Sequence, residues 1–339
     1  MRVAVLGATG AVGRTMLEVL EERGFHIDEL VPLASERSAG NRLAWRGREW
    51  IVRSPTARAF EACDIALFSA GAARSREWAP VAAAEGAIVI DNSSAWRMDP
   101  DVPLVVPEVN PTAAADRPKG IIANPNCSTI QLVVALKALD HAAGLVRVVA
   151  TTFQSVSGAG QRGIDALRAE RAGGAAHDSP FRTRIDGNVI PYIGARDADG
   201  WNEEERKMRA ESRKILGVPA LELTATCVRV PVEVGHAVSA AVELSRPLGL
   251  AEARAAFGAM PGLTVVDDPD PTPLDVAGRD EVRVGRLRID PDRPNVLHIW
   301  VVADNLRKGA ATNAVQIAEQ VAAEPARGEA DISASNARG

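Results

Sequence analysis

The sequence predicts an α/β protein of two domains, a parallel-sheet domain followed by an α+β domain. Short apolar runs alternate with helical stretches over the first third of the chain, which is typical of parallel βαβ units. A glycine-rich turn follows the first of these runs. Beyond about residue 146 the apolar runs become longer and β-rich, which indicates an antiparallel or mixed second sheet. The length of 339 residues is sufficient for two domains.

The first domain is predicted from four segments. Residues 3–6, 65–68 and 87–90 are short apolar runs and predict buried strands. Residues 12–23 have the pattern of a helix that follows the first strand. Prolines become frequent over residues 100–125, where the helical pattern stops.

The second domain begins with a helix predicted over residues 127–138. Its strands are predicted over residues 146–154, 221–230, 237–244 and 296–303. Residues 309–323 have a helical pattern that closes the structured part. The residues after Pro325 are small and polar, and we expect this tail to be flexible.

The composition excludes several classes of protein. Hydrophobic residues make up 46% and charged residues 24%, as in globular rather than disordered chains. The net charge of −5 argues against binding to nucleic acid or to an anionic membrane. No apolar run is long enough to span a bilayer, and the first residues do not resemble an export signal. Three cysteines are too few for a disulfide framework, so we expect a cytoplasmic protein.

The turn after the first strand has the spacing Gly-x-x-Gly-x-x-Gly and opens a helix. Such glycines let the backbone approach a pyrophosphate, and the start of the helix presents unpaired N–H groups to it. The alternative is a tight turn without a ligand, and the position directly after a strand favours the dinucleotide site. The residues concerned are Gly7, Thr9, Gly10, Ala11, Val12 and Gly13.

A second polar segment bears on the choice between NAD and NADP. Ser35, Arg37 and Ser38 offer hydroxyl groups and a cation, which suit the 2′-phosphate of NADP. An NAD site usually has an acidic residue in this place, and Glu36 would repel the phosphate if it turned inward. The segment favours NADP, and the alternative is an ordinary polar loop.

Cys127 lies at the predicted start of a helix. The positive end of the helix dipole favours a thiolate there, so we expect a lowered pKa. Asn126 and Ser128 are suitable capping residues. A buried packing thiol is the alternative, and it is the interpretation we give to Cys63 and Cys227.

A nucleophilic thiol needs a partner that exchanges protons with it. His236 follows Gly235 in a predicted turn between two β-rich runs, where a side chain can face a cleft. The other four histidines lie in ordinary helix, loop or strand contexts. A single histidine is more often structural than catalytic.

Taken together, these segments resemble the aspartate-semialdehyde dehydrogenase family. The resemblance rests on residues 7–13 (GATGAVG), 93–98 (SSAWRM), 124–129 (NPNCST) and 153–160 (FQSVSGAG), and on Arg229 with His236. These motifs run in the family's order over nearly the whole chain. The cysteine motif followed by the glutamine motif is specific, whereas the glycine turn alone is weak.

The resemblance implies a Rossmann-type NADP-binding domain and an α+β catalytic domain of the glyceraldehyde-3-phosphate-dehydrogenase-like type. It places the NADP-binding domain at residues 1–126 and 307–325, the catalytic and dimerisation domain at 127–306, and a tail at 326–339. The implied reaction is the NADPH-dependent reduction of 4-phospho-L-aspartate to L-aspartate 4-semialdehyde with release of phosphate. This step supplies lysine, threonine and methionine synthesis, and homodimers are usual.

The resemblance also implies roles for individual residues. Cys127 matches the nucleophile that forms a thioester, His236 the acid/base, and Gln154 a residue that positions the substrate. The implied substrate contacts are Arg229 for the α-carboxylate, Glu204 for the amino group, Arg97 and Lys207 for the phosphate, and Asn126. The implied cofactor contacts are residues 7 and 9–13, Ser35, Arg37, Ser38, Ser69, Gly71, Ser157, Gly158 and Asn305. No metal site is implied.

Ordinary physical chemistry is compatible with these roles. The substrate carries a carboxylate, an ammonium and an acyl phosphate, so its site needs several cations and one anion. Glu204 and Lys207 are three residues apart and would share one face of a helix. Without the family motif, the spacing of Glu204 and Lys207 would favour a solvated ion pair on a surface helix.

Three alternatives remain from the sequence. A related N-acetyl-glutamyl-phosphate reductase uses the same thioester chemistry but has no need of a carboxylate partner for a free ammonium. An inactive NADP-binding homologue would not be expected to retain Cys127, Gln154, Arg229 and His236 together. An NADP-dependent redox sensor that uses the same thiol is the third.

Overall fold

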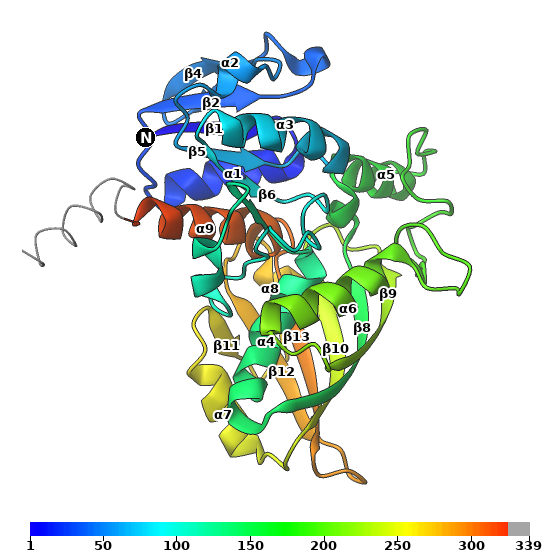
Figure 1. The fold of residues 1–339 in the computed structure, drawn as a ribbon. Helices are drawn as coiled ribbons and strands as arrows, with labels where there is room; N and C mark the ends of the chain where they lie inside the picture. The colour runs from blue at the N-terminus through cyan, green and yellow to red at the C-terminus, as the bar shows by residue number, and fades with distance from the viewer. Residues whose placement is uncertain (325–339) are drawn as a thin grey trace, which may run out of the picture.

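The computed structural model describes residues 1–324 and contains two large sheets (Figure 1). The first sheet has five parallel strands in the order β2-β1-β5-β6-β7. Its strands are β1 (Arg2–Leu6), β2 (Glu29–Leu33), β5 (Ile65–Phe68), β6 (Ile88–Asp91) and β7 (Ile121–Ala123). The central strand β5 is apolar and buried throughout, because helices and loops cover both faces of a parallel sheet.

Helices and a small hairpin surround this sheet. They are α1 (Ala11–Glu22), α2 (Ala57–Phe60), α3 (Ala72–Ala84) and α9 (Thr312–Ala322), with the hairpin β3 (Arg42–Trp45) and β4 (Arg48–Ile51). Although α9 is the last described helix, it packs beside α1 in one apolar cluster with β1 (Figure 1). Met16 and Leu20 of α1 share this cluster with Val315 and Ile317 of α9. The chain therefore returns to the first sheet after the second sheet is complete.

The second sheet has six strands in the order β11-β12-β13-β10-β8-β9. Its pairs are mixed: β8 with β9 and β11 with β12 are parallel, and the others are antiparallel. The strands are β8 (Leu145–Gln154), β9 (Glu222–Arg229), β10 (His236–Leu244), β11 (Leu263–Val265), β12 (Val282–Ile289) and β13 (Val296–Ala303). The helices are α4 (Cys127–Ala143), α5 (Gln161–Arg171), α6 (Glu203–Leu216), α7 (Leu250–Gly258) and α8 (Pro273–Val276).

Helix α4 links the two sheets and begins near the carboxyl edge of the first sheet. Most of its residues are buried, from Ser128 to Ala143, which is the pattern of a helix surrounded by protein. It starts only four residues after β7 ends at Ala123, so its first turn lies near the carboxyl edge of the first sheet. Ligands of open α/β sheets bind at that edge.

One edge of the second sheet brings together residues that are far apart in the sequence. Strands β8 and β9 end at Gln154 and Arg229, which are register partners. Strand β10 begins at this edge with His236, opposite Ala303 at the end of β13. Strand pairing therefore explains how Gln154, Arg229 and His236 come to one place.

The predicted architecture of a Rossmann-type parallel sheet with a second α/β domain is confirmed. Several details differ from the prediction. The segment predicted as one helix over residues 309–323 is a π-helical turn, η4 (Arg307–Ala311), followed by α9. His236 was expected in a turn but is the first residue of β10. The tail predicted at 326–339 lies outside the described residues.

Candidate active site

The glycine-rich turn lies between β1 and α1, at the carboxyl edge of the first sheet. Gly7 has φ +94, and a Cβ there would come within 2.6 Å of the carbonyl oxygen of Ser69. A Cβ on Gly13 would come within 2.1 Å of the carbonyl oxygen of Gly7. Among residues 1–324, no side chain caps the start of α1 at Gly10, so the first N–H groups of the helix stay available to an anion.

The other predicted cofactor residues lie in two places. Ser69 and Gly71 follow β5, and Gly71 precedes α3 with φ +84. Because β1 separates β2 from β5, the turns after β1 and β5 flank the point where strand order reverses, the usual dinucleotide crevice. Ser35 and Arg37 are exposed just beyond β2, with Ser38 half-buried beside them. The residues present therefore fit a dinucleotide at this edge.

The side chains of Cys127 and His236 meet directly. The Cys127 Sγ lies 3.3 Å from the His236 Nε2. Cys127 is the first residue of α4 and is half-buried, whereas His236 is fully buried. A Cβ on Gly309 would lie 3.0 Å from the Cys127 Cβ, so the π-helical turn packs closely against the thiol residue. This pair has the geometry of a nucleophile with its proton partner.

Glu204 is a buried carboxylate at the same site. Its Oε1 accepts hydrogen bonds from Asn126 Nδ2 at 2.7 Å and from Gln154 Nε2 at 3.0 Å. Ser128 Oγ lies 3.3 Å from the same oxygen. Asn126 occupies the N-cap position of α4, but its side chain does not cap the helix and binds Ser128 and Glu204 instead. The predicted residues Asn126, Gln154 and Glu204 therefore form one network.

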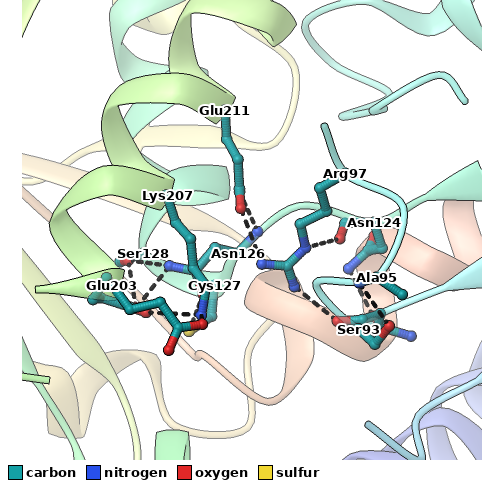
Figure 2. A network of polar contacts seen from close by, with 12 residues as sticks. Ser93, Ala95, Arg97, Asn124, Asn126, Cys127, Ser128, Glu203, Lys207 and Glu211 are labelled. Carbon is teal, nitrogen blue, oxygen red and sulfur yellow. Dashed lines mark hydrogen bonds and ion pairs between the residues drawn. The ribbon is translucent and has the colours of Figure 1, made fainter. Parts of the chain in front are cut away.

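Arg97 is buried and is held by three protein groups (Figure 2). Its Nε donates to the carbonyl oxygen of Asn124 at 2.9 Å, and another N–H donates to that of Asn92 at 2.8 Å. The third contact is an ion pair with Glu211 at 3.0 Å. Glu211 also accepts a hydrogen bond from the Asn126 backbone N–H at 2.7 Å, so it connects Arg97 to the start of α4.

Arg229 lies next to His236. A Cβ on Gly158 would come within 2.7 Å of an Arg229 nitrogen and 3.2 Å of the His236 Nε2, so both side chains press against that glycine. One Arg229 N–H donates to the carbonyl oxygen of Ser155 at 2.6 Å. Lys207 is a quarter exposed, and its Nζ lies 2.7 Å from Glu203 and 3.9 Å from Glu204.

Two of the predicted cofactor residues are engaged with protein groups. Asn305 is buried, and its Oδ1 accepts the backbone N–H of Gly235 at 2.9 Å. Its Nδ2 donates to Ser157 Oγ at 2.9 Å. Both residues lie within a buried polar cluster beside His236, which also contains Ser155.

The expected low pKa of Cys127 is wrong for this structure. Burial and the charge of Glu204 raise the pKa of the Cys127 thiol to about 12, although the Arg229 and Arg97 cations act in the opposite direction. Burial and the neighbouring Arg229 hold the pKa of His236 well below its usual range. The sequence revealed the helix start, but not the burial or the carboxylate supplied by α6. Both shifts favour the uncharged forms, a thiol on Cys127 and a neutral imidazole on His236.

Comparison with known proteins agrees with this geometry. The family model for the semialdehyde dehydrogenase NAD binding domain matches residues 2–117, and that for the semialdehyde dehydrogenase dimerisation domain matches residues 136–308. Aspartate-semialdehyde dehydrogenase of Aquifex aeolicus is 52% identical over 329 residues, which cover 94% of this chain and 97% of that relative. The chain belongs to the aspartate-semialdehyde dehydrogenase family.

Solved structures of the aspartate-semialdehyde dehydrogenase family have the same fold. The Vibrio cholerae aspartate semialdehyde dehydrogenase II complexed with ASA has a TM-score of 0.92 and 48% sequence identity, covering 95% of this chain and 98% of that chain. The Candida albicans enzyme with NADP has a TM-score of 0.74 at 26% identity, covering 95% and 98% respectively.

Two further findings concern residues 1–324 as a whole. Over this range, no helix is both long and apolar enough to cross a membrane. In the same range, histidine, cysteine and acidic side chains form no group of three or more that could hold a metal ion.

Two residues of this family site were missed by sequence reasoning. Ser155 lies within a motif that was recognised, but nothing in the sequence shows that it contacts His236. Glu211 follows Glu204 by seven residues, so the two share a face of α6. That spacing was an available signal for a second buried carboxylate.

The raised pKa of Cys127 predicts a dependence of stability on alkaline pH. The pKa of an unfolded cysteine is about 8.5, and that of Cys127 is raised to about 12. Between these values the unfolded chain loses a proton that the folded chain keeps, so the free energy of unfolding falls as pH rises. We expect the free energy of unfolding of Cys127→Ser to fall less over this pH range than that of the wild type. Urea unfolding across this window measures the difference, and parallel curves for the two proteins would contradict it.

Proposed function

We propose that this protein catalyses the NADPH-dependent reductive dephosphorylation of 4-phospho-L-aspartate to L-aspartate 4-semialdehyde through a thioester on Cys127. The observation that carries the proposal is the 3.3 Å approach of the Cys127 Sγ to the His236 Nε2. This pair lies near the buried arginines Arg97 and Arg229 and the buried carboxylate of Glu204, the kinds of charge that such a substrate requires. The product would supply lysine, threonine and methionine synthesis.

The chain's own residues account for the acyl transfer. The S–H bond of Cys127 breaks as its proton moves to the His236 Nε2, and the sulfur forms a bond to the acyl carbon. The carbon–oxygen bond to the phosphoryl group then breaks, and phosphate leaves. After reduction of the thioester, the bond between sulfur and carbon breaks. The proton that the His236 Nε2 took from Cys127 returns to the sulfur at that point, so the thiol and the neutral imidazole are restored.

Charged side chains around the pair give the site its proposed specificity. A guanidinium has five N–H donors and binds a carboxylate through two of them. Over residues 1–324, the Arg229 side chain makes one hydrogen bond to protein, which leaves donors for the substrate α-carboxylate. In the described part of the chain, the Glu204 Oε2 makes no hydrogen bond and lies 3.9 Å from the Lys207 Nζ, so it is suited to the substrate ammonium. Arg97 and Lys207 are the proposed phosphate ligands.

The dinucleotide would be held by the turns after β1 and β5 and by the segment after β2. When bound, NADPH supplies the hydride that reduces the thioester. The NADP of the Candida albicans relative supports this choice of cofactor. Ser157, Gly158 and Asn305 remain proposed cofactor contacts on the family resemblance.

Arg37 provides a test of the cofactor preference. Its exposed guanidinium follows β2, where a 2′-phosphate would need a cation. We expect Arg37→Ala to raise the KM for NADP+ by on the order of tenfold, because one charge-assisted contact to the phosphate is lost. The KM for NAD+, which lacks that phosphate, should change little and serves as the control. Equal changes for both cofactors would contradict the assignment.

We also propose that the protein acts as a cytoplasmic homodimer, with residues 1–126 and 307–325 forming the cofactor domain and 127–306 the catalytic domain. The dimerisation-domain family model that matches the second sheet supports the dimer. Val146 and Val149 of β8 are 41% and 45% exposed, which is suited to a surface that a second copy would cover. Sedimentation of the purified protein tests this.

An assay of the reverse reaction tests the proposed activity. The protein should reduce NADP+ when given aspartate semialdehyde and phosphate, and the rate should require both. N-acetylglutamate semialdehyde should be a poor substrate, because it offers no free ammonium to Glu204. Preference for the acetylated aldehyde would favour the reductase alternative, and no turnover with either would favour an inactive homologue or a sensor. The ASA in the structure of the Vibrio cholerae relative supports activity with aspartate semialdehyde.

A further inference from the structure

His236 is contacted by one residue on the side that faces away from Cys127. The Ser155 backbone N–H donates to the His236 Nδ1 at 3.1 Å, and the Ser155 Oγ lies 3.0 Å from the same nitrogen. Both contacts arise from the sheet, because β10 pairs with β8 and Ser155 is the first residue after β8. Two groups of one residue therefore compete for a single ring nitrogen.

The two groups of Ser155 favour different tautomers of His236. A backbone N–H can only donate, so it favours an unprotonated Nδ1 and places the ring proton on Nε2. A hydroxyl can donate or accept, so it suits either tautomer according to where its own hydrogen points. The second acceptor available to that hydrogen therefore decides the balance.

Asn305 provides an acceptor, and the Ser157 Oγ, 3.0 Å from the Ser155 Oγ, can also accept or donate. Asn305 follows β13, the other neighbour of β10, and its Oδ1 lies 2.9 Å from the Ser155 Oγ. The orientation of the Asn305 amide is fixed, because the Gly235 N–H must donate to an oxygen and does so at 2.9 Å. When the Ser155 hydroxyl donates to Asn305, its oxygen can accept a hydrogen from the His236 Nδ1.

We propose that Ser155 and Asn305 are positioning residues that control which nitrogen of the His236 ring carries the proton. With the Ser155 hydrogen on Asn305, the ring holds its proton at Nδ1 and the Nε2 can take the proton of Cys127. With the Ser155 hydrogen on Nδ1, the Nε2 carries the proton and can only donate. This inference rests on the working pair of Cys127 and His236 in the proposed function.

The proton balance is closed within these residues. In the accepting state, the S–H bond of Cys127 breaks and a bond forms between that proton and the His236 Nε2. The products are a thiolate and an imidazolium, so the net charge of the pair does not change. The imidazolium then donates its Nδ1 hydrogen to the Ser155 Oγ, whose own hydrogen remains on Asn305.

Other charges act on this pair and must be kept constant in a test. Arg229 lies beside His236 and opposes the imidazolium, whereas it favours the thiolate. Glu204 opposes the thiolate, and Arg97 favours it. Neither Ser155 nor Asn305 is ionised, so a change at Ser155 alters the hydrogen bond without altering a charge.

The test is the rate at which iodoacetamide alkylates Cys127 in the free protein, followed by peptide mass spectrometry. Ser155→Ala removes the Oγ that, within residues 1–324, is the only acceptor at hydrogen-bond distance from the His236 Nδ1. We therefore expect alkylation near neutral pH to be slower by about tenfold. The difference should shrink as pH rises, because hydroxide then ionises the thiol without the imidazole. Ser212→Ala removes a buried hydroxyl that has no hydrogen-bond partner within residues 1–324, and it should leave the rate unchanged.

A second variant should act in the opposite direction. Asn305→Asp keeps an acceptor for the Ser155 hydroxyl and makes it stronger, so we expect faster alkylation near neutral pH, by roughly threefold. In the Ser155→Ala background this gain should disappear, since the carboxylate then has no hydroxyl through which to act. If the gain persists there, the effect is one of charge alone and the proposal is overturned.

The remaining outcomes are also decisive. A Ser155→Ala rate equal to the wild type near neutral pH, or lower by the same factor at every pH, would overturn the proposal. If Ser155→Ala does not fold, the Asn305→Asp variant decides the question. An alkylation rate near neutral pH that is no faster than the wild type would then overturn the proposal. Alkylation needs neither substrate nor dinucleotide, so a failure of the semialdehyde assay with this alkylation pattern intact would count against the proposed function only.

Discussion

Replacement of Cys127 by alanine is expected to abolish turnover while leaving dinucleotide binding unchanged. The sulfur faces the His236 Nε2 at 3.3 Å and is the proposed attachment point of the acyl group. Removing the nucleophile of a covalent mechanism costs on the order of 10⁴-fold or more in kcat. The phosphate-dependent reduction of NADP+ by aspartate semialdehyde measures the loss.

Cys63→Ala is the matched control for this experiment. Cys63 is buried in the core of the first sheet, where its Sγ contacts the carbonyl oxygen of Ala59. We expect the control to keep its rate and both variants to bind NADPH as the wild type does in a fluorescence titration. Near-normal turnover by Cys127→Ala would exclude the thioester mechanism.

The parts of the fold that the sequence predicted are those with a strong local pattern. Strands β1, β5 and β8 coincide closely with apolar runs, and Gly7 and Gly13 mark a turn that excludes a Cβ. Strand β7 was not predicted, because it is three residues long and lies among prolines. Prediction thus succeeded where neighbours in sequence determine the structure.

The electrostatics of the site could not be predicted in the same way. The expected effect of the α4 dipole on Cys127 is local, whereas the opposing effects come from burial and from Glu204, 77 residues later in the chain. The role of Ser155 similarly depends on the pairing of β10 with β8. The family motif could identify Cys127 and His236 as partners, but only the tertiary structure shows the burial and the neighbouring charges that shift their pKa values.

Glu211→Gln is expected to lower the free energy of unfolding by about 3–5 kcal/mol, the usual cost of breaking a buried ion pair from one side. Glu211 is nearly inaccessible and holds two donors at once, Arg97 on one oxygen and the Asn126 N–H on the other. A glutamine side chain offers one oxygen and one NH2 group, so one of these two donors must face another donor. Equilibrium unfolding in urea measures the change.

The exposed pair Arg74 and Glu77 is the control, because its nitrogen–oxygen distance of 3.0 Å equals that between Arg97 and Glu211. Both of its side chains are about half exposed, so Glu77→Gln should change the free energy by less than about 0.5 kcal/mol. Equal effects in the two pairs would show that burial does not strengthen the contact between Arg97 and Glu211.

Glu211→Gln should also impair the reaction in protein that is folded, because Glu211 holds groups of the proposed site in place. Glu211 fixes Arg97, the proposed phosphate ligand, and the backbone at Asn126, directly before Cys127. We expect the KM for phosphate in the reverse reaction to rise, whereas the KM for NADP+ should change little, because the glycine turn after β1 makes no contact with Glu211. In folded Glu211→Gln protein, an unchanged KM for phosphate would contradict the assignment of Arg97 as a phosphate ligand. Glu211 would then have a purely structural role.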